Sequence, residues 1–254
     1  MNRRIALAGL AVAALAIGLT LAYQFRKPLM AVLKPARTAP GAPFTVEQRV
    51  TQFGEGVAAR LAADFSAAGV PYPPHEVAYL AFKDARQLQV YARSASSKPW
   101  RFIRQYEVLA ASGKPGPKLM EGDRQVPEGV YKAELLNPNS RFHLSIRLDY
   151  PNHFDRSMAQ RDGRTKLGGD IMIHGNAVST GCLAMGDEAA EELFILAAKV
   201  GKERTRIVVS PTDWRSPAAA SAAAPRHAFA WTSELYAALR SELNQYPTPG
   251  PGEP

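Results

Sequence analysis

The sequence has a single cysteine, Cys182, and a histidine, His174, lies eight positions before it. A thiol is a weak nucleophile until it loses its proton, and a neighbouring imidazole can accept that proton and stabilise the thiolate. The two side chains would therefore suit nucleophilic acyl transfer. The alternative is structural, because a lone cysteine is often a small buried apolar residue and a lone histidine is often satisfied within a core.

The residues between the histidine and the cysteine are small enough to shape such a site. Gly175 and Gly181 permit backbone turns that residues with a Cβ resist, so the chain can fold back and bring Cys182 beside His174. The amide groups of Gly181 and Cys182 are candidate donors for an oxyanion hole. Two further candidates, which could orient the imidazole through hydrogen bonds, are Ser179 and Thr180.

Regular elements are expected on both sides of this stretch. Residues 171–173 form a short apolar run that predicts a buried strand ending at His174. A helix is expected over 187–200, with Asp187 as its N-cap, acidic residues in its first turn and Gly201 at its end. A last core strand is expected over 207–209.

The region before the site predicts more strands. Residues 77–92 read as a hairpin, and 100–110 as a further strand. Apolar residues alternate with polar ones over 142–150, which indicates a strand with one buried face. His143 lies on the opposite face from the apolar set, so we expect a surface or cleft residue there and not a second catalytic base. Residues 152–169 are polar, and predict either a solvated loop or a cleft wall whose basic residues meet substrate carboxylates.

An amphipathic helix is expected at the start of this region. Thr45 and Gln48 match a capping box, and Gly69 is a suitable C-terminal stop. We expect the helix to pack on the same chain, with binding to a partner as the alternative. Its apolar stripe recurs every three or four residues and consists of Val46, Val50, Phe53, Val57, Leu61 and Phe65.

The N-terminus has the pattern of an exported protein. Arg3 and Arg4 precede an uncharged apolar run over 5–23, which Arg26 closes. This pattern predicts a signal peptide or a membrane anchor, and the length of the run favours an uncleaved anchor with the rest of the chain outside the cytoplasm. Disulfides form in such compartments, so a single cysteine there is a candidate reactive thiol.

Composition narrows the class of partner. The formal net charge is +8, which favours an anionic partner such as lipid head groups or peptidoglycan. No nucleic-acid-binding motif is present, and export makes nucleic acid a poor candidate. The histidines and the cysteine lack the paired spacing of a metal site, and no dinucleotide or phosphate-loop motif occurs. We therefore expect no metal and no cofactor.

A wider pattern runs through three segments of the chain. Residues 116–118 precede a Glu-Gly-Asp-x-x-x-Pro-Glu-Gly-x-Tyr sequence over 121–131, residues 142–152 supply a strand and a turn, and 174–182 supply His-Gly and Ser-x-Gly-Cys. In this order they resemble the catalytic domain of the L,D-transpeptidase (YkuD-type) family, over roughly positions 76–210. Many members carry arginine two places after the cysteine. Ala184 stands there in this chain, which resembles a divergent proteobacterial murein L,D-transpeptidase/amidase branch.

The resemblance, with the predicted strands, implies a mostly β fold with flanking helices (α+β) and a β-sandwich-like catalytic domain. The expected domain plan has four parts. They are a signal anchor or signal peptide (1–25), a linker with the amphipathic helix (26–75), the catalytic domain (76–210), and a linker, short helix and disordered tail (211–254). In the last part, Thr232 or Ser233 is the expected N-cap of the helix.

The resemblance also implies a reaction on peptidoglycan stem peptides. Cys182 would attack the diaminopimelate carbonyl of a stem tetrapeptide and release D-alanine, with His174 as general base and then general acid. An amine would resolve the thioester. In the alternative, an amidase would cleave the link between peptidoglycan and a lipoprotein. A third reading is a non-catalytic, membrane-tethered peptidoglycan-binding protein. All three place the protein in the periplasm or on the periplasmic side of the inner membrane.

Overall fold

The computed structural model describes residues 43–216 and 229–250. The apolar run over 5–23, most of the expected linker after 216 and the last four residues lie outside this range, so the expectations for them stay predictions. Within the described residues, none of the helices has the length and apolar character needed to cross a membrane.

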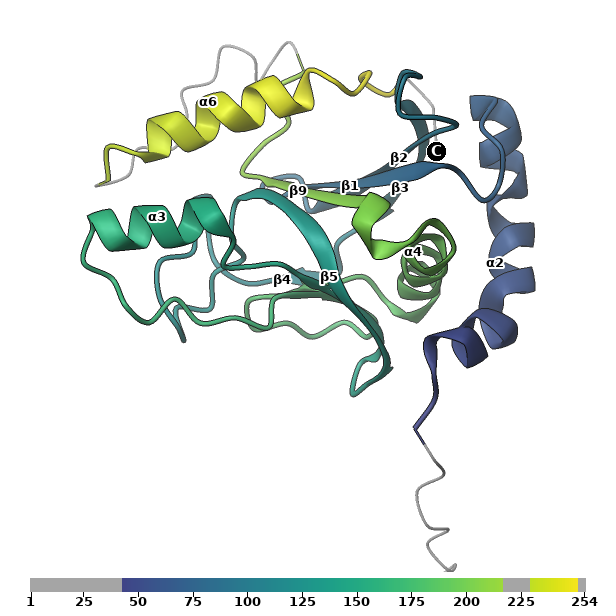
Figure 1. Ribbon diagram of the computed structural model, residues 1–254, viewed down its shortest axis with the longest axis horizontal. Coiled ribbons are helices and arrows are strands. Elements are labelled where there is room, and N and C mark those ends of the chain that lie inside the picture. The colour runs from purple at the N-terminus through teal and green to yellow at the C-terminus, as the bar shows by residue number, and fades with distance from the viewer. Residues whose placement is uncertain (1–42, 217–228, 251–254) are drawn as a thin grey trace, which may run out of the picture. The chain divides into compact units, whose positions relative to one another are not determined.

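The described part of the chain is built on one curled, nine-stranded sheet (Figure 1). Its strand order is β3-β2-β1-β9-β5-β6-β7-β8-β4. The strands are β1 (Glu76–Phe82), β2 (Gln87–Arg93), β3 (Arg101–Glu107), β4 (Ala110–Ala111), β5 (Gly129–Ser140), β6 (His143–Leu148), β7 (Met172–His174), β8 (Leu183–Ala184) and β9 (Thr205–Ser210). The helices are α2 (Val46–Ala68), α3 (His153–Arg161), α4 (Asp187–Val200), the short 3-10 helix η1 (Lys202–Arg204) and α6 (Thr232–Leu243).

Strand β5 joins the two halves of the sheet. Residues 129–132 pair with β9, whereas the rest of the strand, from Ala133 onward, pairs with β6 through an irregular register. The first half of the sheet contains β3, β2, β1 and β9, and the second half contains β6, β7, β8 and β4. The mostly β fold with flanking helices is therefore confirmed, in the form of a curled sheet.

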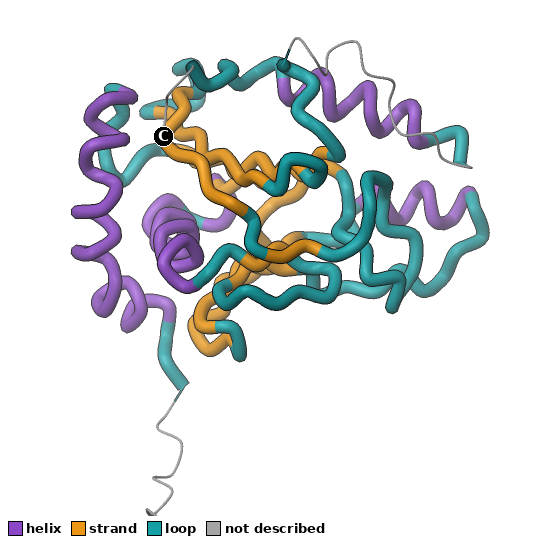
Figure 2. Tube along the Cα trace, turned by 180° about the vertical axis from the view of Figure 1, so that it is seen from behind, coloured by secondary structure: helices purple, strands orange, loops and turns teal. Residues whose placement is uncertain are grey.

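Helix α4 packs in the larger of two apolar clusters. Leu193 and Leu196 of α4 are completely buried there, and the hydroxyl of Tyr79 on β1 donates a hydrogen bond to the Leu193 carbonyl at 2.6 Å. Helix α2 lies beside α4 (Figures 1 and 2). The expected stripe of α2 faces this cluster, so its packing on the same chain is confirmed, as are the capping box at Thr45 and the left-handed C-cap at Gly69.

Helix α6 covers the other face of the first half-sheet. Leu80 of β1 points into this second cluster, because neighbouring strand residues face opposite sides and Tyr79 faces the first. Leu235 and Leu239 of α6 pack there with Met158 of α3. Figure 1 shows α6 and α3 on the same side of the molecule.

Several local expectations were wrong. The 152–169 segment contains α3, whose N-terminus is a capping box between Asn152 and Asp155, in a stretch that looked like loop because its apolar residues are few. Gly186 and not Asp187 is the N-cap of α4, and Trp231 precedes α6 without a side-chain cap. Part of the tail expected to be disordered is described, and the Pro247 carbonyl accepts a hydrogen bond from Tyr91 at 2.8 Å.

Candidate active site

Strand β7 ends at His174, and strand β8 begins immediately after Cys182. They are parallel neighbours in which Ile173 pairs with Leu183, and both of these side chains are buried in the first cluster. Side chains alternate along a strand. His174, one residue after Ile173, therefore faces the opposite side of the sheet, and Cys182 lies in the turn that leads into β8.

The imidazole of His174 is held from two sides. It is 2% exposed, and the Phe142 ring stacks on it with 4.7 Å between ring centroids. Its Nδ1 lies 2.6 Å from the Gly175 carbonyl oxygen. A carbonyl only accepts hydrogen bonds, so Nδ1 carries the proton and Nε2 keeps a lone pair. Burial lowers the pKa of His174, which favours this neutral form.

The Cys182 thiol is partly buried, and its hydrogen bond goes to the Asp170 carbonyl, with 3.7 Å between sulfur and oxygen. Burial raises the pKa of Cys182, and the charge of Asp170 adds to this, while a backbone contact at Met172 and the charge of Lys118 act in the opposite direction. The resting pair is therefore a thiol and a neutral imidazole. The ion pair suggested by the sequence would form only when the proton moves.

The two candidate oxyanion donors already have partners. The Cys182 amide donates to Ser179 Oγ at 2.9 Å, and the same hydroxyl donates to the Cys182 carbonyl at 2.6 Å. The Gly181 amide donates to Ser112 Oγ at 2.6 Å. Ser179 thus binds the cysteine backbone and not the imidazole, and Thr180 is exposed. Neither was positioned as the sequence suggested, because the orienting contacts of His174 come from Gly175 and Phe142.

Glycine is needed at positions 175 and 181 for different reasons. Gly181 has φ +95°, a conformation that favours glycine. Gly175 is required for space, because a Cβ there would lie 2.5 Å from Asp187 Oδ1 and 2.7 Å from the Phe142 carbonyl oxygen. The same Asp187 carboxylate accepts a hydrogen bond from the Asn176 amide at 2.7 Å, which ties the turn after β7 to the start of α4.

A further segment, residues 112–128 between β4 and β5, supports the cysteine turn and is named here the 112–128 loop. Asp123 organises its tip: the carboxylate accepts backbone hydrogen bonds from Leu119, Met120 and Gln125. Lys118, whose side chain is 5% exposed, forms an ion pair with Asp123 at 2.5 Å. The sequence pattern over this segment gave no indication of a role in supporting the cysteine.

Ala184, which stands where many members of the resembled family have arginine, differs in its surroundings as well as in its chemistry. Ala184 is completely buried in β8, where it pairs with His174 on one side and with Ala110 of β4 on the other. The position therefore offers no cation beside the imidazole. His143, which was expected at the surface or in a cleft, is half-buried, and its ring nitrogen lies 2.9 Å from Glu191 of α4.

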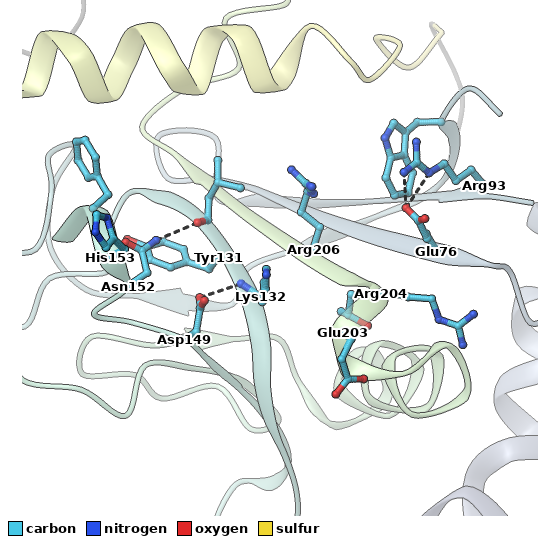
Figure 3. A pocket seen from close by; sticks show the side chains of 14 residues that line it. Glu76, Arg93, Tyr131, Lys132, Asp149, Asn152, His153, Glu203, Arg204 and Arg206 are labelled. Carbon is cyan, nitrogen blue, oxygen red and sulfur yellow. Dashed lines mark hydrogen bonds and ion pairs between the residues drawn. The ribbon is translucent and has the colours of Figure 1, made fainter. Parts of the chain in front are cut away.

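A cavity of about 710 Å³ lies away from this site, on the side of the sheet that α6 covers (Figure 3). Both basic and acidic side chains line the cavity, and two of them, Arg93 and Glu76, form an ion pair with each other. None of its lining residues belongs to the 112–128 loop or to the turn at Cys182. Across residues 43–216 and 229–250, no cluster of three or more histidine, cysteine or acidic side chains could hold a metal ion.

Comparison with known proteins defines the class. The sequence model of the L,D-transpeptidase catalytic domain (YkuD) matches residues 78–209, and the chain belongs to this family. The chain is 34% identical over 115 residues to YafK, a provisionally assigned L,D-transpeptidase of Escherichia coli (strain K12). That match covers 44% of this chain and 44% of YafK, so it spans less than half of either length.

Two solved structures resemble the chain at lower identity. The helical cell shape determining protein Pgp2 from Campylobacter jejuni is 23% identical, covers 54% of this chain and 48% of its own, and has a TM-score of 0.42. Bd1075 from Bdellovibrio bacteriovorus is also 23% identical, covers 56% of this chain and 50% of its own, and has a TM-score of 0.39.

Proposed function

We propose that the protein is a cysteine acyltransferase of the L,D-transpeptidase type that acts on peptidoglycan stem peptides, with Cys182 as nucleophile and His174 as base. The observation that carries the proposal is the parallel pairing of β7 with β8, in which His174 ends the first strand and Cys182 immediately precedes the second. The fixed tautomer of His174, with its Nε2 lone pair available, supports the same roles. Membership of the family makes a peptidoglycan substrate the natural choice.

The reaction follows from this arrangement. Nε2 of His174 takes the thiol proton as the Cys182 sulfur attacks the diaminopimelate carbonyl of a stem tetrapeptide. The tetrahedral intermediate collapses when the imidazolium gives the proton to the leaving D-alanine nitrogen, and a thioester remains. An acceptor amine then attacks the thioester, His174 takes its proton, and the thiol is restored as the new amide forms.

The oxyanion of the tetrahedral intermediate requires hydrogen-bond donors, and without substrate the two candidate amides donate to hydroxyl groups of the protein itself. The amides of Gly181 and Cys182 face the hydroxyls of Ser112 and Ser179, and hydroxyl groups rotate easily. We propose that substrate binding exchanges these partners, so that the two amides stabilise the developing negative charge. The internal bonds would hold the turn ready in the absence of substrate.

Hydrolysis is the second candidate. Ala184 leaves the space beside His174 without the cation that many family members carry there, so the acceptor site differs from theirs. With water as acceptor, the same thioester would yield an amidase that detaches a lipoprotein from peptidoglycan. Both readings include an exported chain, held at the periplasmic side of the inner membrane by the apolar run over 5–23.

The full chain and its Cys182→Ala variant should be incubated with purified tetrapeptide muropeptides, and separately with muropeptides that carry a lysine-linked protein remnant. Products are read by mass spectrometry. Diaminopimelate–diaminopimelate dimers that need Cys182 establish the transpeptidase, whereas loss of the remnant without dimers establishes the amidase. If neither substrate changes in a Cys182-dependent way, the enzyme proposal is wrong and a peptidoglycan-binding role remains.

A further inference from the structure

Helix α6 lies outside the residues that match the family, yet one aromatic residue in the helix and one just before it bond to segments inside the matched range. The Tyr236 hydroxyl donates a hydrogen bond to Glu128 Oε2 at 3.0 Å. Trp231, which precedes the helix, donates through its indole nitrogen to Asp162 Oδ2 at 2.9 Å. Both aromatic side chains are buried, so these bonds are shielded from water.

The first connection ends at the base of the 112–128 loop. Glu128 is 1% exposed, and its other carboxylate oxygen accepts the Gly116 amide and pairs with the Lys83 ammonium at 3.0 Å. Lys83 also donates to the carbonyls of Gly116 and Val126, at 2.8 and 2.9 Å. The Glu128 carboxylate and its lysine thus hold the loop at two points, and Tyr236 fixes the outer oxygen of that carboxylate.

The second connection ends at the tip of the loop. The Asp162 oxygen that receives the Trp231 bond also accepts from Arg164 at 2.8 Å. Arg164 donates in turn to the Leu119 carbonyl at 3.0 Å, and its guanidinium lies 5.6 Å from the centre of the Trp231 ring. Tyr236 of α6 therefore bonds directly to the base of the loop, and Trp231, just before α6, is linked to the tip through Asp162 and Arg164.

The loop in turn supports the cysteine. Ser112 Oγ accepts the Gly181 amide at 2.6 Å and donates to the Arg124 carbonyl at 2.7 Å, so it joins the Gly181 turn to the far side of the loop. The loop also carries Lys118, whose positive charge lowers the pKa of Cys182 against the larger effect of burial. A displaced loop would loosen the turn and move this charge.

We propose that α6 holds the 112–128 loop in the geometry that Cys182 needs, and that Tyr236 is a positioning residue that acts through Glu128. Its catalytic consequence rests on the proposed function, but its effect on the thiol does not. The path from Tyr236 to Gly181 runs through the hydrogen bonds of Glu128 to Tyr236 and Gly116, then along the loop backbone to Ser112, whose hydroxyl accepts the Gly181 amide.

Tyr236→Phe tests the proposal because it keeps the ring and removes only the hydroxyl. The matched control is Tyr246→Phe: this residue is also buried and follows α6, but its hydroxyl donates to Glu242 at 3.1 Å and has no bond to the loop. In the full chain, the rate of Cys182 alkylation by iodoacetamide is measured against pH, with urea unfolding of each variant alongside.

We expect Tyr236→Phe to move the midpoint of the curve of alkylation rate against pH to higher pH. We also expect it to lower kcat/KM on muropeptides by about tenfold, since small misplacements of reacting groups have effects of this size. Tyr246→Phe should leave both within about twofold, even where it lowers stability by a similar amount. Lys118→Met should give the same upward shift, and adding Tyr236→Phe to it should give little more, because the two act in one chain of contacts.

Three results would overturn the inference: a wild-type alkylation profile in Tyr236→Phe, an equal shift in Tyr246→Phe, or full additivity with Lys118→Met. The alkylation readout does not depend on turnover. A chain that alkylates as expected but leaves muropeptides unchanged would contradict the proposed reaction and still support the positioning role.

Discussion

The carbonyl oxygen of Gly175 lies 2.6 Å from Nδ1 of His174, the residue just before it. This contact sets the tautomer of the imidazole without help from an acidic side chain. Neutral peptide groups can orient a base but stabilise its charged form less than a carboxylate does. The arrangement therefore favours a neutral base that is charged only during the reaction.

The pH dependence should reflect that neutral resting pair. Burial lowers the pKa of His174 and raises the pKa of Cys182. The acidic limb of kcat/KM should therefore lie below the ordinary imidazole value of about 6.5, because the base stays unprotonated to lower pH. The rate at which Cys182 is alkylated without substrate should rise only at a pH above the range in which an ordinary cysteine thiol ionises. Fast alkylation at pH 6 would instead demonstrate a preformed ion pair.

Ser179→Ala should lower kcat by about tenfold while Cys182 remains open to alkylation. The reason is that Ser179 Oγ bonds both the amide and the carbonyl of Cys182, and so fixes the amide for the oxyanion. Steady-state kinetics on muropeptides and labelling of the thiol give the two readouts. Thr180→Ala, at an exposed side chain, should change kcat by less than about twofold; a comparable loss there would restore the role in orienting the imidazole that the sequence suggested.

Gly175→Ala should destabilise the fold by about 1–3 kcal/mol and abolish most activity, because the new Cβ would overlap Asp187 and the Phe142 carbonyl. Urea unfolding and turnover are the measurements. Gly169→Ala is the matched control: a Cβ there would meet only the Tyr150 carbonyl oxygen, at 3.9 Å. Its unfolding free energy should change by less than about 0.5 kcal/mol, and equal losses in both variants would contradict the steric explanation.

Asp155 should make stability depend on pH in a direction opposite to most carboxylates. Burial raises its pKa to about 6, above its value in the unfolded chain. The stability that its protonated form contributes is present below about pH 4 and is lost as pH rises through about 6. Between pH 4 and pH 7.5, the wild type should lose about 2–3 kcal/mol of unfolding free energy relative to Asp155→Asn, which does not titrate there.

Urea unfolding of both chains at the two pH values tests this. The titration of His174 contributes in the other direction, because a lowered histidine pKa adds stability as pH rises, but it is common to the two chains and cancels in the difference. A pH-independent difference between the chains would mean that folding leaves the pKa of Asp155 unchanged.

Local signals explain what the sequence could predict. The stripe and capping box of α2, the hairpin of β1 and β2 and the strand ending at His174 depend on neighbouring residues, and they were all found. The pairing of β5 with two half-sheets and the contact between Tyr236 and Glu128 join residues far apart in the chain, for which one sequence carries no signal. The partners of the Gly181 and Cys182 amides depend equally on tertiary structure. The catalytic roles of Cys182 and His174 stay predictions.

Strand β5 has a consequence for how the molecule opens. Its first four residues are hydrogen-bonded to β9 and the remainder to β6, so one continuous backbone belongs to both half-sheets. The hydrogen bonds between β5 and β9, in the half-sheet that α6 covers, cannot break without disturbing the half-sheet that contains β7 and β8. Amide hydrogens of β9 and β6 should therefore exchange with solvent in a single cooperative opening, at one shared rate.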